Sequence, residues 1–146
     1  LKKKPDILIL EGWCVGAKPE GGRSLNRPIN VLEKNADKKK IWRSYVNNQL
    51  KSKYSKLFDQ LDSLLYLKAK NFKLLKKWRL KQEKKLKMKS GTKKNSRIMN
   101  EKEVETFMMT YQRITQNMFK NAPKYSSAVI DLNENHQIKK VKFKNA

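Results

Sequence analysis

The first residue whose type and place point to chemistry is Glu11, which directly follows the mostly apolar run Asp6 to Leu10. A short apolar run bounded by Pro5 and Gly12 is typical of a strand buried on both faces of a parallel sheet. Ligands of open α/β sheets bind at the carboxyl ends of such strands. A carboxylate there can hold Mg²⁺, directly or through water, or orient or deprotonate an attacking hydroxyl. An acid that only caps the following turn is the plainer alternative.

A second group of chemical interest lies on one predicted helix, in the segment 78–85 with the sequence WRLKQEKK. Arg79 and Glu83 are four residues apart, so they can pair on the helix surface. Arg79 also lies on the apolar stripe of that helix, where a charged side chain needs a partner. A guanidinium group in that position could reach phosphate oxygens with its fixed fork geometry. A solvated basic helix with local ion pairs explains the same spacing equally well.

Two other reactive residue types are interpreted as structural. The single histidine, His136, has no Ser, Cys or Asp near it in a catalytic context, so we expect it in a turn or at a strand edge. Cys14 is expected to be a small packing residue, and one cysteine excludes an intramolecular disulfide and a Cys-rich zinc site. The phosphate-loop pattern GxxxxGK[ST] is absent, because Leu86 stands where the segment 90–93 would need its first glycine.

The elements that must position these residues alternate between strands and helices, which predicts an α/β fold with a largely parallel sheet. Glycines and prolines predict a loop over 15–35. A helix with apolar spacings of three and four is predicted from Asp37 to about Leu61, with a weaker pattern near 51–53 that allows a break. A second short strand is predicted at Ser63 to Leu67.

The second half of the chain continues this alternation. A basic helix is predicted over Asn71 to about Lys87, followed by a polar loop over 89–96. Asn100 and Glu103 have the spacing of a capping box and begin the most regular helix, which we expect to end at Ala122-Pro123. The last elements predicted are a strand at Ala128 to Leu132, a turn at 133–135 and an edge strand within His136 to Phe143.

Composition limits the class of protein. The 146 residues fit one domain, and 36 Lys+Arg against 13 Asp+Glu give a net charge of +23. No apolar run approaches the roughly 20 residues that span a bilayer, and no signal peptide pattern is present. We therefore expect a cytoplasmic protein with no membrane partner; its oligomeric state is not indicated.

The positive charge is concentrated in one part of the chain. Residues 68–97 hold twelve Lys and two Arg against one acid, Glu83, a net charge of +13. A solvated helix face with a following loop is the plain interpretation, and a surface that binds phosphates is the functional one. A small basic nucleic-acid-binding protein is therefore the alternative function, although no zinc-finger spacing or RNP-type aromatic strand accompanies the charge.

The motifs together resemble the glycerate kinases of the plant and cyanobacterial type, which are P-loop kinases related to uridine kinase, phosphoribulokinase and pantothenate kinase. The strand ending in Glu11-Gly12 is shared by the whole group, and the following Trp-x-x-Gly narrows it. The resemblance covers nearly the whole chain. Its matches, in chain order, are PDILILEGWCVG (5–16), INVLE (29–33), WRSYVN (42–47), LFDQLDSL (57–64), WRLKQEKKL (78–86), YQRIT (111–115) and DLNENH (131–136).

The resemblance implies transfer of the ATP γ-phosphate to a hydroxyl of D-glycerate, giving 3-phosphoglycerate and ADP with Mg²⁺. It implies that Glu11 is the acid near the metal and the acceptor hydroxyl, and that Arg79 stabilises charge on the transferring phosphoryl group. Nucleotide binding would also involve two further residues, Gln82 and Arg113. The acceptor would be bound by the glycine-containing turn and the following loop, through Gly12, Trp13, Arg23, Arg27 and Asn30.

In that family the phosphate loop lies well before the Glu-Gly strand, on a first strand and helix that these residues do not include. The chain begins with Leu1. We therefore expect the C-terminal portion of a three-layer P-loop kinase fold, from a truncated or split gene, with an inactive remnant as a further alternative. Within one partial domain we distinguish four segments: 1–35 with the Glu-Gly strand and acceptor loop, 36–67, the lid-like segment 68–99, and 100–146.

Overall fold

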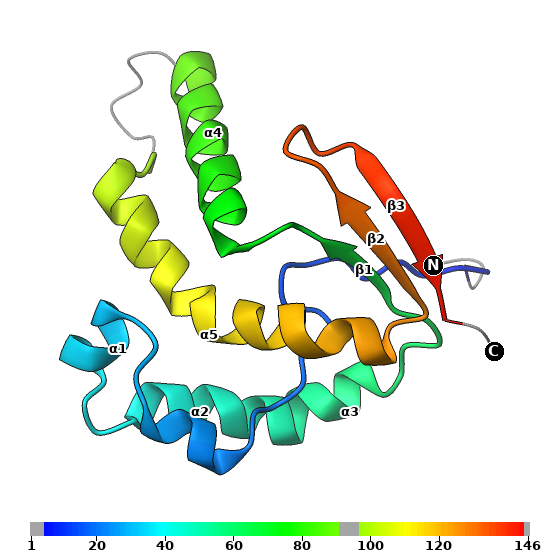
Figure 1. The fold of residues 1–146 in the computed structure, drawn as a ribbon, viewed down its shortest axis with the longest axis horizontal. Helices are drawn as coiled ribbons and strands as arrows, with labels where there is room; N and C mark the ends of the chain where they lie inside the picture. The colour runs from blue at the N-terminus through cyan, green and yellow to red at the C-terminus, as the bar shows by residue number, and fades with distance from the viewer. Residues whose placement is uncertain (1–4, 91–96, 145–146) are drawn as a thin grey trace.

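The computed structural model describes residues 5–90 and 97–144 (Figure 1). Its elements, in chain order, are η1 Gly22–Asn26, α1 Val31–Ala36, α2 Ile41–Gln49, η2 Leu50–Tyr54, α3 Ser55–Phe58, β1 Leu65–Lys68, α4 Phe72–Ser90, α5 Glu101–Tyr125, β2 Ala128–Leu132 and β3 Ile138–Phe143. The α/β class is as predicted. Most of the predicted polar loop, residues 91–96, lies outside the described residues.

The sheet is small and mixed rather than largely parallel. β1 pairs with β2 in parallel, from Leu65 opposite Ala128 to Lys68 opposite Asp131. β3 returns antiparallel on the other side of β2 through the turn after Leu132, so the strand order is β1-β2-β3. The edge strand β3 and its turn therefore follow the prediction, and β1 keeps one edge without a partner among the described strands.

The first predicted strand is wrong. Residues 6–10 form no ladder, and Ile7, Leu8 and Ile9 are 79, 87 and 84% exposed. The physical reason is that no described strand lies beside this run, so its backbone has nothing to pair with and its apolar side chains have no sheet face to join. The segment instead leads, without regular secondary structure, to the turn at 13–16.

Two other expectations need correction. The predicted loop over 15–35 contains η1 and most of α1, and α1 is capped by Asn30, whose side chain accepts a hydrogen bond from the Glu33 N–H. In place of a break near 51–53, the helical backbone continues from α2 through the π-helical turn η2 into α3. The weakened apolar pattern thus marks a wider helical turn, not an interruption.

Helix α5 is the centre of the molecule, lying between α2–α3 on one side and α4 with the sheet on the other (Figure 1). The predicted capping box of Asn100 and Glu103 is present, and Val104 and Met108 are at most 1% exposed. A second core cluster joins Ala17, Leu50, Met118 and Ala122. The helix continues two residues past Pro123, to Tyr125, because only one backbone N–H is lost there.

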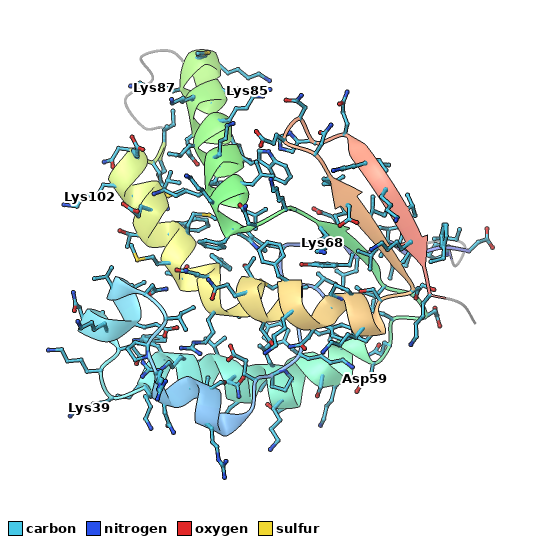
Figure 2. The ribbon with its side chains drawn as sticks, viewed as in Figure 1. Lys39, Asp59, Lys68, Lys85, Lys87 and Lys102 are labelled. Atoms are coloured by element: carbon cyan, nitrogen blue, oxygen red, sulfur yellow. The ribbon has the colours of Figure 1, made fainter. Side chains whose placement is uncertain are left out.

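Charged side chains occupy the outside of this core. Figure 2 shows Lys39, Asp59, Lys85, Lys87 and Lys102 on the outer surface of four different parts of the chain, and all five are exposed. Within the described residues no helix has both the length and the apolar character needed to cross a membrane.

Candidate functional site

A cleft of about 1100 Å³ lies between the N-terminal segment, β1, α4 and the middle of α5. Glu11 and Trp13 line it from the N-terminal segment, and Arg79 and Gln82 line it from α4. These residues lie more than sixty positions apart in sequence, so the fold brings together the two groups that the sequence singled out. Apolar side chains from 7–10 and from β1 supply much of the remaining wall.

Trp13 attaches the turn after Glu11 to helix α5. Its indole Nε1–H donates to Thr115 Oγ1 at 3.1 Å, and its ring stacks on Tyr111 with centroids 5.0 Å apart and planes 13° apart. Phe107 meets the same indole edge-on at 6.4 Å. Offset stacks and edge contacts of this kind favour one ring orientation, so the indole fixes where the Glu11–Gly12 turn enters the cleft.

Arg79 is held in one orientation by three contacts. Its Nη2 donates to Glu83 Oε1 at 2.5 Å, its Nη1 donates to Gln82 Oε1 at 2.8 Å, and its guanidinium carbon lies 5.1 Å from the centre of the Phe107 ring. The Arg79–Glu83 pair is the one that the four-residue spacing predicts. The Nε–H of Arg79 is buried and has no hydrogen-bond acceptor among the described residues. The Arg79 side chain as a whole is 25% exposed, and Nη1 and Nη2 each keep a second N–H, so its guanidinium at the cleft wall is suited to binding an anion.

Glu83 joins this arginine to the start of α5. The residue is 5% exposed, and its second oxygen, Oε2, accepts the backbone N–H of Met99 at 3.0 Å. The Glu83 carboxylate thus links α4 to the residues that lead into α5. The sequence indicated the pair with Arg79 but not this second contact, which depends on where 97–100 returns to the helix.

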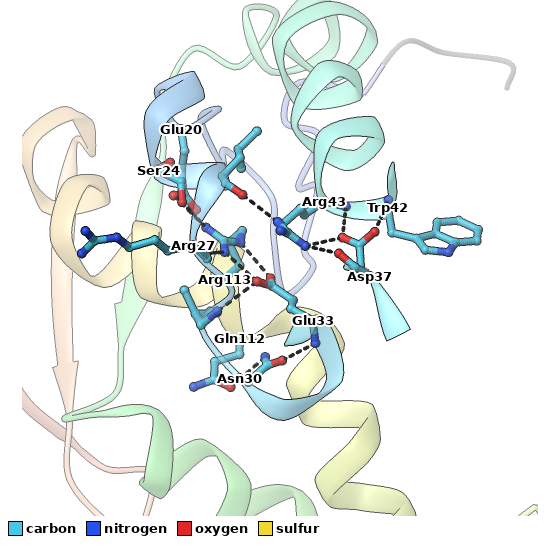
Figure 3. A network of polar contacts seen from close by, with 12 residues as sticks. Glu20, Ser24, Arg27, Asn30, Glu33, Asp37, Trp42, Arg43, Gln112 and Arg113 are labelled. Atoms are coloured by element: carbon cyan, nitrogen blue, oxygen red, sulfur yellow. Dashed lines mark hydrogen bonds and ion pairs between the residues drawn. The ribbon is translucent and has the colours of Figure 1, made fainter. Parts of the chain in front are cut away.

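Arg113, which the resemblance implies for nucleotide binding, does not line this cleft. Figure 3 shows its guanidinium among carboxylates and carbonyls of the segment before α2. Nε and Nη2 donate to Glu33 at 2.8 and 2.6 Å, Nη1 to Glu20 and the Ser24 carbonyl, and Nη2 also to the Arg27 carbonyl. All five N–H donors of the side chain are thus engaged inside the protein. The structure therefore does not bring Arg113 to the Arg79 cluster.

Several residues of the predicted acceptor loop form hydrogen bonds in the same network. The Asn30 amide caps α1 and also donates to the Met109 carbonyl and to Gln112, both on α5 (Figure 3). Arg23 and Arg27 are exposed, as is Gly12. The structure thus leaves two arginine side chains of this loop in solvent, and it uses Asn30 to attach the loop to α5.

A second buried ion pair, between Asp37 and Arg43, joins helix α2 to the segment that precedes it. Asp37 accepts the backbone N–H groups of Trp42 and Arg43, in the first turn of α2, at 3.0 and 3.1 Å, and its Oδ2 accepts from Arg43 Nη1 at 2.9 Å (Figure 3). Arg43 also donates Nε–H to the Leu25 carbonyl at 2.7 Å. Asp37 is the first residue of the helix predicted from the sequence, whereas the contact between Arg43 and η1 could come only from the fold.

These contacts shift the acidity of their carboxyl groups. Burial alone would raise the pKa of Glu33, but hydrogen bonds from Arg113 and the Ile29 N–H, with the charge of Arg113, lower it below its usual value. Burial acts on Asp37 in the same sense, and the hydrogen bonds from Trp42 and Arg43 outweigh it, so the pKa is again lowered. The pKa of Arg113 is raised, chiefly by its hydrogen bond to Glu33.

The lowered pKa values predict a loss of stability in acid. A carboxyl group whose pKa is lower in the folded chain stabilises it above the unfolded value, near about 4, and loses that effect as pH falls through the folded value. We expect the urea midpoint to be level from pH 7 to 5 and to fall below pH 4. Replacing both groups, by Glu33→Gln together with Asp37→Asn, should reduce this fall of the urea midpoint in acid. Asp59→Asn, at an exposed position, should leave the fall unchanged. Equal slopes of the midpoint against pH in the two variants would contradict the assignment.

Cys14 and His136 match their structural interpretation. Burial raises the pKa of the Cys14 thiol to about 11, and the residue packs against the Met118 and Ala122 cluster. His136 lies in the β2–β3 turn with φ of 64° and stacks on Trp78 with ring centroids 4.1 Å apart. Neither residue has the surroundings of a nucleophile or a general base.

The fold is similar to that of part of a solved small-molecule kinase structure. The solved structure of a D-glycerate 3-kinase from Cryptococcus neoformans var. grubii matches 97% of this chain and 50% of that chain, with a TM-score of 0.75 and 21% sequence identity. The resemblance predicted from the sequence is therefore confirmed at the level of the fold.

A sequence comparison points to the same class. The protein described as an uncharacterized kinase, mug58, from Schizosaccharomyces pombe is 34% identical over 86 residues, which is 58% of this chain and 30% of that protein. No family model matches the chain. The chain spans half or less of the length of each of these proteins.

Proposed function

We propose that this chain is the C-terminal part of an ATP-dependent kinase that phosphorylates a hydroxyl of D-glycerate to give 3-phosphoglycerate. The observation that carries the proposal is the position of two charged residues in the cleft. Arg79 is held in one orientation on the α4 wall, and Glu11 lies on the wall formed by the N-terminal segment. The kinase fold and the residue matches support the same class. Phosphoryl transfer needs little covalent help from a protein, so positioned charges of this kind are its main requirement.

In this proposal Arg79 stabilises the charge that develops on the transferring phosphoryl group. Its orientation is set by Glu83, Gln82 and Phe107, so no reorganisation is needed when the charge develops. Gln82 shares the same wall and would contact the nucleotide phosphates. Arg113 would act at a distance, because its donors hold the acceptor loop against α5.

Glu11 serves the acceptor side. Glu11 lines the cleft and forms no ion pair among the described residues. No cluster of three potential metal ligands occurs among those residues either. Mg²⁺ in kinases is bound by one or two carboxylates together with substrate phosphates, so a single free carboxylate fits. When bound, Mg²⁺ would neutralise phosphate charge. Glu11 itself would orient the attacking hydroxyl and accept its proton.

The acceptor would lie against the turn at Gly12 and Trp13. Its carboxylate requires a cation, and the candidates that the resemblance implies are the exposed Arg23 and Arg27, neither of which lines the cleft in this structure. Asn30 contributes by fixing the end of that loop on α5. The Trp13 indole is anchored by Thr115 and Tyr111, so it supplies a fixed wall for a small hydroxy acid.

The nucleotide phosphates require a loop that the chain does not contain in sequence. In this proposal the strand that precedes such a loop would lie in the cleft, between residues 7–10 on one wall and β1 on the other. Leu65 and Leu67 of β1 are 62 and 61% exposed, as are most side chains of 7–10. Two apolar segments with unpaired edges on either side of a cleft are suited to receiving a strand between them.

The experiment that tests this proposal provides the strand and the phosphate loop from another protein. The chain is co-expressed with the half of the Cryptococcus D-glycerate 3-kinase that the fold match does not cover, and Mg-ATP-dependent phosphorylation of D-glycerate is measured on the purified complex. We expect turnover from the complex and a loss of about 10²- to 10³-fold in kcat for Arg79→Gln. The matched control Arg97→Gln, at an exposed position, should keep its rate. A complex that forms yet transfers no phosphate to D-glycerate would instead support the inactive remnant.

A further inference from the structure

Helix α4 carries a regular row of lysines that the proposed kinase chemistry does not use. Each member is four residues from the next and exposed; the row is Lys73, Lys77, Lys81, Lys85 and Lys89. With a rise of about 1.5 Å per residue the row is about 24 Å long. Along the axis of B-form DNA each strand places one phosphate about every 3.4 Å, so a row of this length spans several phosphates of one strand, whereas the phosphates of one nucleotide meet only part of it.

The row is little neutralised by its surroundings. The only acid on α4 is Glu83, which is buried and bonded to Arg79 and Met99. Of the five lysines, one forms an ion pair among the described residues, Lys77 with Glu134 at 3.3 Å, and both partners are well exposed. Like charges four apart on a helix cost about 0.2–0.5 kcal/mol per pair, so the row is a continuous unfavourable arrangement unless an anion binds it.

An aromatic pair lies beside the middle of this row. Trp78 follows Lys77 directly, its indole N–H donates to the Glu134 carbonyl at 2.8 Å, and the exposed His136 stacks on it at 4.1 Å. The cleft wall that contains this pair also contains Lys81 and Lys85. Figure 2 shows Lys85 projecting from the side of α4 that faces the β2–β3 hairpin. Cations that follow a backbone, with aromatic rings beside them, are the features that bind single-stranded nucleic acid.

We propose that the α4 lysine row and the His136–Trp78 pair bind single-stranded nucleic acid, with the phosphates along the row and a base against the histidine. The contacts are to backbone and base faces, so the binding has little sequence preference. This inference does not rest on the proposed kinase function. It concerns equilibrium binding by the chain alone, so its failure and that of the kinase proposal are distinguishable.

The test measures fluorescence anisotropy of a labelled 20-nucleotide single-stranded RNA titrated with the full chain between 50 and 200 mM salt. The variant Lys81→Gln, Lys85→Gln, Lys89→Gln is compared with Lys51→Gln, Lys53→Gln, Lys56→Gln, which removes the same charge from η2 and α3. We expect the α4 variant to bind at least tenfold more weakly, with its logarithmic salt slope reduced by about 2, since single strands release about 0.7 counterion per contact. The matched variant should lose less than threefold.

The aromatic contact is tested separately with His136→Asn, because asparagine tolerates the positive φ at this position. We expect about tenfold weaker binding with an unchanged salt slope, since stacking does not release counterions. Equal losses in both lysine variants, or no binding by the parent chain at 50 mM salt, would overturn the proposal. Equal affinity for polyglutamate of the same charge would assign the row to an acidic polypeptide instead, and full displacement by ATP at equal phosphate concentration would assign it to the nucleotide.

Discussion

Replacing Arg113 by methionine is expected to lower the free energy of unfolding by about 3–4 kcal/mol, the size typical when one partner of a buried ion pair is removed. The Arg113 side chain is 9% exposed, and the Glu33 and Glu20 side chains are 12 and 18% exposed. Without the guanidinium, two nearly buried carboxylates lose their cation. The carbonyls of Ser24 and Arg27 lose their donor as well.

The measurement is urea unfolding followed by circular dichroism at pH 7, with Arg23→Met as the matched control. Arg23 is exposed, so its replacement should change stability by less than about 0.5 kcal/mol. Adding Glu33→Gln to Arg113→Met should recover part of the loss, because the buried charge is removed with its partner. A loss below about 1 kcal/mol for Arg113→Met would show that the network contributes little.

The structural role of Arg113 cannot be predicted from its neighbours in the sequence. Arg113 follows the helical pattern of α5, and its partners Glu33 and Glu20 lie 80 and 93 positions away. A local signal was present on the other side of the contact. Asn30 and Glu33 have the same spacing as Asn100 and Glu103, so a second helix start at Val31 could have been predicted from the sequence.

The elements that the sequence did predict are those with a strong local cause. Helix α4 follows from its apolar stripe and α5 from apolar periodicity and a capping box, and β1, β2 and β3 follow from short apolar or alternating runs between turns. The run at 6–10 has the same local signal as a buried strand, yet it has no partner within the described residues. Periodicity reports which side chains favour burial, whereas a strand also needs a neighbour, and that is not a local property.

Helix α5 explains how one short chain presents both halves of the candidate site. Thr115 and Tyr111 hold the Trp13 turn on the cleft side, while Arg113 and the Met109 carbonyl hold the acceptor loop on another side. Tyr111 to Thr115 is a little more than one helical turn, so a displacement of α5 would move both attachments together. The regular helix α5, which apolar periodicity and capping predict, therefore determines where these two attachments lie relative to each other.

Replacing Glu83 separates a positioning role from a structural one. Glu83→Ala is expected to cost about 3 kcal/mol of stability, because Arg79 loses its carboxylate and the Met99 N–H loses its acceptor. Glu83→Gln keeps one oxygen for these donors but removes the charge, so a loss of about 1–2 kcal/mol is expected. Thermal unfolding of the chain alone measures both values, with Glu105→Gln, an exposed acid on α5, as the control.

The same two variants, assayed in the assembled kinase well below their unfolding midpoints, test the position of Arg79. If Glu83 orients the guanidinium toward the transferring phosphoryl group, Glu83→Gln lowers kcat about tenfold and leaves the KM for D-glycerate unchanged. In the Arg79→Gln background the same replacement should have almost no further effect on kcat, because the group it positions is gone. A merely structural Glu83 would lower the unfolding midpoint and leave kcat unchanged in both backgrounds.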